Sequence, residues 1–271
     1  MRMLIVASLF LAALAQGAEL QVLRDQAYGP DARQRYDVYL PAAPAKDAHI
    51  ILMVHGGAWR IGDKRMGRTL DNKSAHFTAR GDVFVSTNYR MLPQADVATQ
   101  AEDIARVLAA VQAKAAGWGV NPARVLLVGH SAGAHLAALL ASAPGIGARF
   151  GVQPWQATIA LDSAAYDVEE IMKRRHLPLY DPAFGTDPAQ WQALSPQAQL
   201  KAPTHPLLLV CSSERADSCP AARAFAARAQ ALGGRAEVLP QPLNHGQIND
   251  KLGTPGDYTA AVDAFIASLK P

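Results

Sequence analysis

The serine at position 131 stands in a pattern that could make its hydroxyl a nucleophile. Residues 129–133 read Gly-His-Ser-Ala-Gly, a Gly-x-Ser-x-Gly motif, with an apolar run before it and small residues after it. In that setting the motif is typical of a sharp strand-to-helix turn that raises the serine above the strand end. The alternative is a glycine-bracketed turn in another α/β protein. We expect Ser131 to be the nucleophile of a covalent mechanism.

A serine hydroxyl attacks efficiently only when a base takes its proton. His245 lies in the segment Pro-Leu-Asn-His-Gly, after the last strand that the sequence predicts. That chain position suits the base of a serine hydrolase, whereas His176 and His205 lie earlier in the chain. We therefore predict His245 as the base. The alternative is an exposed loop histidine.

A carboxylate must orient the imidazole and stabilise its protonated form. The loop after the next-to-last predicted strand offers Glu214 and Asp217. We prefer Asp217, because a short side chain in a loop closed by a Cys211–Cys219 bridge would be held rigidly. Asp162, directly after an earlier strand, is the third candidate. Each of these acids could also be an ordinary surface residue.

Acyl transfer also needs N–H donors for the negative oxygen that forms in the transition state. The segment His-Gly-Gly-Ala-Trp at 55–59 follows an apolar run, and its glycines allow the backbone to approach a ligand closely. We predict that the backbone N–H groups of Gly57, Ala58 and Ala132 form this oxyanion hole. The histidines show no paired spacing typical of metal ligands, so neither a metal nor an organic cofactor is predicted.

Three segments together carry a family resemblance. They are His-Gly-Gly-Ala-Trp with Gly-Asp-Lys at 62–64, Asn-Tyr-Arg at 88–90, and Gly-His-Ser-Ala-Gly-Ala-His-Leu at 129–136. The chain resembles the α/β-hydrolase superfamily, and within it the hormone-sensitive-lipase-like and feruloyl-esterase-like carboxylesterases and the kynurenine formamidases with their HGGxW motif. The likeness runs from about Tyr28 to His245. One departure concerns the acid: the family usually has Gly-x-x-Asp where this chain runs from Ser212 to Arg215.

The resemblance implies hydrolysis of a carboxylic ester, or of a related amide, by Ser, His and Asp through an acyl-enzyme. A carboxylesterase acting on a small-molecule ester is the preferred function. The alternatives are an arylformamidase that cleaves N-formylkynurenine, an acyltransferase with the same residues, and a non-catalytic exported binding protein of the same fold. The substrate itself stays open, because fold and chemistry do not define it.

The elements that must position these residues alternate along the chain. Strands are predicted at 36–40, 50–54, 83–87, 125–128, 158–161, 206–210 and 236–239, and helices at 94–116, after the serine, at 221–232 and at 257–269. This alternation predicts an α/β protein with a mostly parallel central sheet and helices on both faces. The resemblance makes it an α/β-hydrolase fold. The Pro-rich region 163–202 is predicted to be an irregular, lid-like insertion that shapes the pocket.

The first 17 residues resemble a secretory signal peptide, with Arg2, an apolar run at 3–14 and small residues at 15–17. That run is short for a membrane anchor. We therefore expect residues 18–271 to form one catalytic domain that is periplasmic or secreted and has no stable membrane insertion. An oxidising compartment favours a Cys211–Cys219 disulfide. The net charge of +3 and the scattered basic residues give no sign of nucleic-acid binding, and no oligomeric state is indicated.

Overall fold

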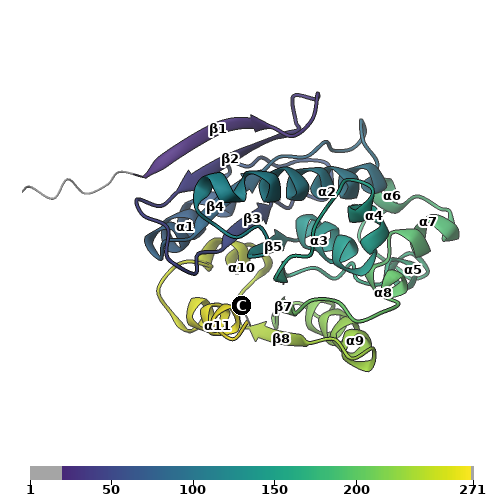
Figure 1. The fold of residues 1–271 in the computed structure, drawn as a ribbon. Coiled ribbons are helices and arrows are strands. Elements are labelled where there is room, and N and C mark those ends of the chain that lie inside the picture. The colour runs from purple at the N-terminus through teal and green to yellow at the C-terminus, as the bar shows by residue number, and fades with distance from the viewer. Residues whose placement is uncertain (1–19, 270–271) are drawn as a thin grey trace, which may run out of the picture.

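The centre of the molecule is an eight-stranded sheet, seen in a computed structural model that describes residues 20–269. The expected signal peptide at 1–17 lies outside these residues. The strands are β1 (Gln21–Ala27), β2 (Arg35–Leu40), β3 (Ile50–Val54), β4 (Val83–Thr87), β5 (Val125–His130), β6 (Ala157–Leu161), β7 (Leu207–Ser212) and β8 (Ala236–Gln241). Their order in the sheet is β1-β2-β4-β3-β5-β6-β7-β8 (Figure 1). Neighbouring strands from β4 to β8 pair in parallel, and β2 and β1 join antiparallel at one edge, which confirms the mostly parallel sheet.

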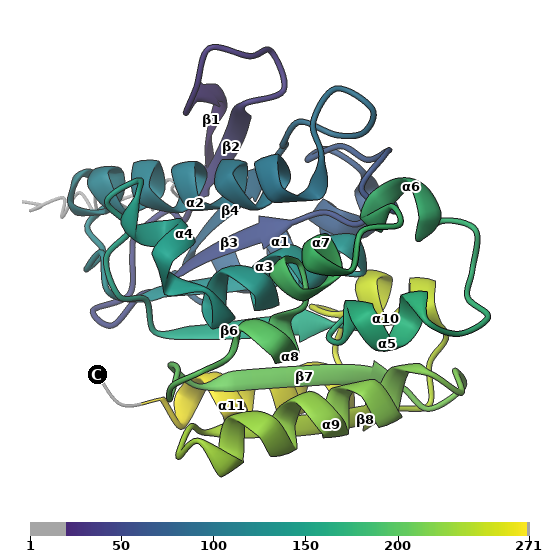
Figure 2. The ribbon, with the colours of Figure 1, turned by 90° about the vertical axis from the view of Figure 1, so that its right-hand side faces the viewer.

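Helices cover both faces of this sheet (Figure 2). They are α1 (Gly67–Ala79), α2 (Val97–Lys114), α3 (Ala132–Ser142), α4 (Pro144–Ala148), α5 (Val168–Met172), α6 (Asp181–Phe184), α7 (Pro188–Ala193), α8 (Pro196–Gln199), α9 (Ser218–Ala231), α10 (His245–Lys251) and α11 (Asp257–Ala267). A short 3₁₀ turn, Ala115–Trp118, follows α2. Helices α2, α3 and α9 lie on one face, and α1, α10 and α11 lie on the other. Within residues 20–269, none of these helices is both long and apolar enough to cross a bilayer.

Strand β3 shows why the sequences of the core strands are unbroken runs of apolar residues. Ile50, Leu52 and Val54 pack with residues of α2 and α3, whereas Ile51 and Met53 pack with residues of α1, α10 and α11. Every residue of the strand is fully buried. Successive side chains of a strand point to opposite faces, so a sheet covered on both sides needs apolar residues at every position.

The carboxyl ends of five neighbouring strands meet at one edge of the sheet. In the register of the ladder, Val54 pairs with Gly129, His130 with Leu161, and Leu161 with Val210. In open α/β sheets this edge is where ligands bind. The residues that follow β3, β5, β6, β7 and β8 are therefore brought together, although they lie far apart in the sequence.

The region 163–202 contains four short helices, α5 to α8, rather than an irregular segment. Asp167 accepts a hydrogen bond from the N–H of Glu170 at the start of α5, and Asp187 accepts one from Ala189 at the start of α7. Prolines occupy the first or second position of α6, α7 and α8. Proline is well tolerated there because the first N–H groups of a helix have no partner within the helix. The prolines therefore mark helix starts here.

Candidate active site

Ser131 sits in a strained turn between β5 and α3, with φ of 56° and ψ of −117°. A Cβ on Gly129 would lie 2.2 Å from the carbonyl oxygen of Gly133, and a Cβ on Gly133 would lie 2.3 Å from the carbonyl oxygen of Val54. Both positions therefore exclude any side chain, which explains the spacing of the motif. The N–H of Ser131 donates to the carbonyl of Leu161 at 2.9 Å, and this ties the turn to β6.

The His-Gly-Gly-Ala-Trp loop lies directly against this turn. A Cβ on Gly56 would be 2.9 Å from the Cβ of Ser131. Gly57 and Ala58 follow with φ of 120° and 52°. Ala132 is the first residue of α3, so its N–H is among those that no carbonyl of the helix can accept. The structure thus places the loop that contains Gly57 and Ala58 beside the turn of Ser131, and the role of these N–H groups as oxyanion donors stays a prediction.

Strained backbone is concentrated at this edge of the sheet. Ala58, Trp59, Ser131 and Asp162 are non-glycine residues with positive φ, and within residues 20–269 only Asp25 joins them. Such conformations cost of the order of 1–3 kcal/mol each and persist where the surrounding structure enforces them, often at functional sites. Asp162, which follows β6, belongs to this group with φ of 53°.

His245 is the first residue of α10, directly beside the turn that carries the serine. Asn244 caps the helix: its side chain accepts from the N–H of Gln247, whose side chain accepts from the N–H of Asn244. This capping box begins a helix where the sequence suggested a loop. The ring of His245 lies 4.5 Å from that of His130, centroid to centroid, and His130 Nε2 donates to the carbonyl of His245 at 3.0 Å. His130 immediately precedes Ser131.

The carboxylate that contacts His245 is Asp162, which is fully buried at the end of β6. Its Oδ2 lies 2.5 Å from Nδ1 of His245 and also accepts from Nη1 of Arg215 at 2.8 Å. Its Oδ1 accepts from the N–H of Ser212 at 2.8 Å and from the hydroxyl of Ser218. Four donors therefore surround this carboxylate, which matches the lone pairs that an ionised carboxylate offers.

These donors keep Asp162 ionised. Burial by itself would raise the pKa of Asp162, but the hydrogen bonds from His245, Ser218 and Ser212 and the charge of Arg215 outweigh it and hold the pKa well below its usual value. An ionised oxygen only 2.5 Å from Nδ1 requires a proton between the two atoms. Nδ1 of His245 therefore carries a proton, and in the neutral imidazole Nε2 is the nitrogen that has a lone pair with which to accept one.

The prediction that Asp217 orients the imidazole is corrected by this geometry. Oδ2 of Asp217 accepts from Nη2 of Arg215 at 3.0 Å, and its side chain is 38% exposed. Glu214 is exposed as well. Residues 213–217 lead outward from β7 into α9, whereas the left-handed turn at Asp162 keeps its carboxylate at the sheet edge beside His245. Two signals pointed to this acid: Asp162 directly follows a buried strand, and Arg215 departs from the pattern of the family.

The predicted disulfide between Cys211 and Cys219 is present. The segment that it closes contains three of the four donors to Asp162, namely Ser212, Arg215 and Ser218. The bridge therefore constrains the loop that supplies donors to the carboxylate of Asp162.

Loss of this bridge is expected to lower both stability and turnover. In the chain-entropy account, closing so short a loop stabilises the folded state by about 2–3 kcal/mol. The double variant Cys211→Ser/Cys219→Ser should lose about that much unfolding free energy in urea titrations and should show a lower kcat. Wild-type protein with a reductant serves as the matched comparison. A double variant with unchanged stability and kcat would contradict the role given to the loop.

His135 joins three parts of the site without facing solvent. Trp59 Nε1 donates to Nδ1 of His135 at 3.2 Å, and Nε2 of His135 donates to the carbonyl of Leu194 at 2.8 Å. Burial lowers the pKa of His135 to about 4. The neutral ring therefore connects the His-Gly-Gly-Ala-Trp loop, helix α3 and the end of α7. Its edge-to-face contact with Trp59 adds to this structural role.

The buried histidines predict a loss of stability in mild acid. Burial lowers the pKa of His55 and His135 to about 4 and that of His130 to about 3, below the unfolded value of 6.5. Between these pH values the unfolded chain binds more protons than the folded protein does. The unfolding free energy should therefore fall as the pH drops from about 6.5 toward 4. Urea titrations across this range measure it. His176→Gln is the control, since the hydrogen bond with Asp181 raises the pKa of that histidine, whereas burial lowers the pKa of the other three; a flat wild-type profile would refute the prediction.

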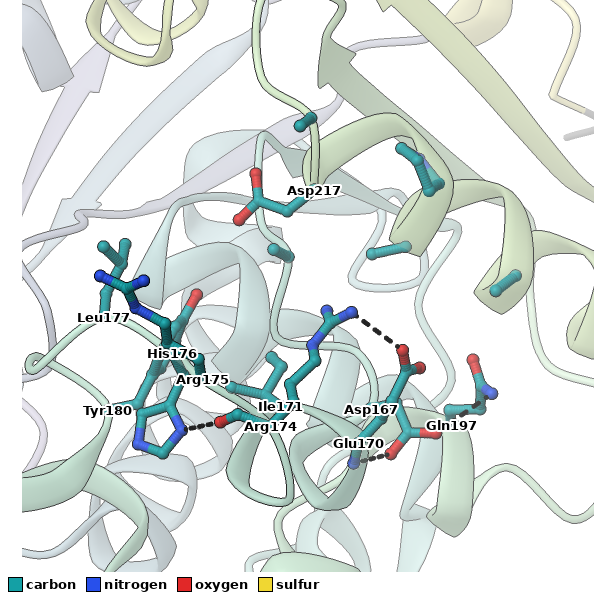
Figure 3. A pocket seen from close by; sticks show the side chains of 15 residues that line it. Asp167, Glu170, Ile171, Arg174, Arg175, His176, Leu177, Tyr180, Gln197 and Asp217 are labelled. Atoms are coloured by element: carbon teal, nitrogen blue, oxygen red, sulfur yellow. Dashed lines mark hydrogen bonds and ion pairs between the residues drawn. The ribbon is translucent and has the colours of Figure 1, made fainter.

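A cavity of about 690 Å³ lies between the region 164–180 and the start of α9, and Asp162, His245 and Ser131 are not among the residues that line it (Figure 3). Helix α5, the segment that follows it and the start of α9 line the cavity, with Ile171, Leu177 and Tyr180 among its apolar residues. Asp217 lies on one side of it, and Arg174, paired with Glu170 at 3.2 Å, lies on the other. Because Asp217 binds Arg215, and Arg215 binds Asp162, the wall of the cavity is connected to the acid of the site.

Known structures share this arrangement of strands and helices. A truncated carbohydrate esterase from gut microbiota superposes with a TM-score of 0.77 at 15% identity, covering 93% of this chain and 97% of that one. The chain has the α/β-hydrolase fold. It also matches the BD-FAE family model over residues 36–149. The matched region holds the predicted nucleophile and oxyanion loop but ends before Asp162 and His245.

Two curated relatives extend the similarity. An isoprenylcysteine alpha-carbonyl methylesterase of Arabidopsis thaliana is 29% identical over 238 residues, which cover 81% of this chain and 55% of that protein. A kynurenine formamidase of Danio rerio is 30% identical over 153 residues, which cover 56% of this chain and 49% of that protein. The chain thus spans about half the length of these relatives. The predicted resemblance to esterases and kynurenine formamidases of this superfamily is confirmed.

Proposed function

We propose that this α/β-hydrolase is a serine carboxylesterase in which Ser131 is the nucleophile, His245 the base and Asp162 the acid. The observation that carries the proposal is the 2.5 Å contact between the buried carboxylate of Asp162 and Nδ1 of His245, beside the strained turn of Ser131. A neutral imidazole held in this tautomer by an ionised carboxylate is what a serine nucleophile needs as its base.

The reaction would proceed through an acyl-enzyme. Nε2 of His245 takes the hydroxyl proton as the oxygen of Ser131 attacks the acyl carbon. The N–H groups of Gly57, Ala58 and Ala132 stabilise the resulting oxyanion. His245 then gives its proton to the leaving alcohol, and a water molecule repeats the sequence to release the carboxylic acid.

Asp162 supports this cycle without taking the proton itself. Its negative charge stabilises the imidazolium that forms each time His245 accepts a proton. The four donors around the carboxylate favour its ionised form, so the proton stays on the imidazole. The function of the acid is therefore electrostatic and orientational.

An ester is preferred because the similarity to the Arabidopsis thaliana isoprenylcysteine alpha-carbonyl methylesterase extends over 81% of this chain. The similarity to a kynurenine formamidase favours arylformamide hydrolysis as the second candidate, because the same residues could cleave that amide.

Side-by-side rates on p-nitrophenyl acetate, p-nitrophenyl butyrate and N-formylkynurenine test the proposal. We expect the kcat/KM for at least one of the two esters to exceed that for the formamide. A preference for the formamide would make the chain a formamidase. Hydrolysis of none of these substrates by folded protein would contradict a hydrolase of either kind.

We also propose that the protein works in an oxidising compartment, the periplasm or the cell exterior. The Cys211–Cys219 bridge supports this, because disulfides persist in such compartments and are rare in the cytosol. Cell fractionation combined with thiol titration tests it. Recovery of the protein from the cytosol with two free thiols would contradict it.

A further inference from the structure

Arg215 contacts the imidazole of His245 and the carboxylates of Asp162 and Asp217. Its Nη1 lies 2.8 Å from Oδ2 of Asp162 and 3.0 Å from Nδ1 of His245, and its Nη2 lies 3.0 Å from Oδ2 of Asp217. The side chain is 24% exposed. Burial alone would lower the pKa of Arg215, but the carboxylates of Asp162 and Asp217 raise it, so the guanidinium stays charged.

Only one of the two contacts of Nη1 can be a hydrogen bond in the reactive state. Nδ1 of His245 carries one proton, which it donates to Asp162, so it cannot accept a second one from Arg215. If Nδ1 gave up that proton, Arg215 could donate to it, and the proton would move to Nε2. An Nε2 that carries the proton cannot take one from Ser131. Arg215 is therefore compatible with catalysis only while Asp162 stays close to Nδ1.

The two oxygens of Asp162 are held from opposite sides. Ser212 and Ser218 donate to Oδ1, and Arg215 donates to Oδ2, the oxygen that faces the imidazole. Without Arg215, Oδ2 would keep only the hydrogen bond from His245, and the orientation of the carboxylate about its Cβ–Cγ bond would be less firmly fixed. Asp217 holds the other arm of the guanidinium, so the planar fork of Arg215 spans two carboxylates.

We propose that Arg215 is a positioning residue for the Asp162–His245 pair, anchored by Asp217 and carried on the loop that the Cys211–Cys219 disulfide closes. It acts on the reaction through Asp162 and His245, the two groups of the site that it contacts. This inference rests on the proposed function. It also gives Asp217 a role, as the anchor of the positioning residue.

Replacement of Arg215 tests the proposal through turnover. Arg215→Met is expected to lower kcat about 10- to 100-fold with KM nearly unchanged, because small misplacement of catalytic groups has effects of this size. Arg215→Lys should lie between Met and wild type, because an ammonium keeps one donor and the charge but cannot span both carboxylates. The rate of labelling by a fluorophosphonate should fall in the same order, since it reports the nucleophile without substrate binding.

Arg149→Met is the matched control. Arg149 directly follows α4 and forms an Arg–carboxylate pair with Glu102 at 3.0 Å, and its loss should leave kcat and labelling unchanged. Arg215→Met with wild-type kcat, or Arg215→Lys no better than Arg215→Met, would overturn the proposal. If Arg215→Met does not fold, Arg215→Lys decides: labelling as fast as wild type refutes a positioning role. Failure of wild-type protein to react with the fluorophosphonate would instead refute the proposed function.

Discussion

Asp162→Asn is expected to lower kcat for ester hydrolysis about 10⁴-fold, whereas Asp217→Asn should lower it by less than about tenfold. The asparagine keeps the size of the side chain but loses the negative charge. Its amide could also donate to Nδ1 of His245, which would leave the proton on Nε2, the wrong tautomer. A factor of 10⁴ corresponds to about 5 kcal/mol of transition-state stabilisation.

The comparison between the two aspartates is internally controlled, since Arg215 contacts both. Steady-state kinetics on p-nitrophenyl acetate provide the measurement, and urea titrations confirm that each variant folds. Glu214→Gln should behave like wild type, because that side chain is exposed. The reverse ranking, with Asp217→Asn far more damaging than Asp162→Asn, would return the role of the acid to Asp217.

Ser131→Ala is expected to lower kcat at least about 10⁴-fold, because it removes the atom that forms the acyl-enzyme. The folded state should tolerate the change, since alanine keeps the Cβ and the hydroxyl plays no part in the N–H bond to Leu161. Ser74→Ala, at a half-buried position on α1, is the control. Turnover of the Ser131→Ala variant at a rate comparable with wild type would rule out the covalent mechanism.

The nucleophile turn and the core strands could be predicted from the sequence because local rules determine them. Gly129 and Gly133 are required by close approaches of the backbone, and a buried parallel strand such as β3 needs an unbroken apolar run. Ser131 and the His-Gly-Gly-Ala-Trp loop could also be predicted, because each directly follows a strand of this kind.

Helix α1 escaped prediction because its buried stripe is hardly apolar. The buried residues are Thr69, Lys73 and Phe77, spaced four apart on one side of the helix. Lys73 donates to the carbonyls of Arg68 and Asn249, and so a lysine fills a place where helical patterns show an apolar residue. Burial lowers the pKa of Lys73 to about 7.

The acid escaped prediction because its partners are distant in the sequence. Asp162 contacts His245, 83 residues away, and Arg215, 53 residues away, and no local pattern records such contacts. The preference for Asp217 rested on a loop stiffened by the disulfide. That loop does hold the site, but it does so by supplying donors to Asp162 rather than by supplying the acid.

Peptide mapping after reaction with a fluorophosphonate tests the central claim most directly. The account predicts a single adduct, on Ser131, in wild-type protein, and a labelling rate that falls by orders of magnitude in both His245→Ala and Asp162→Asn. An adduct on another residue, or labelling of Ser131 that is equally fast without the imidazole, would contradict it.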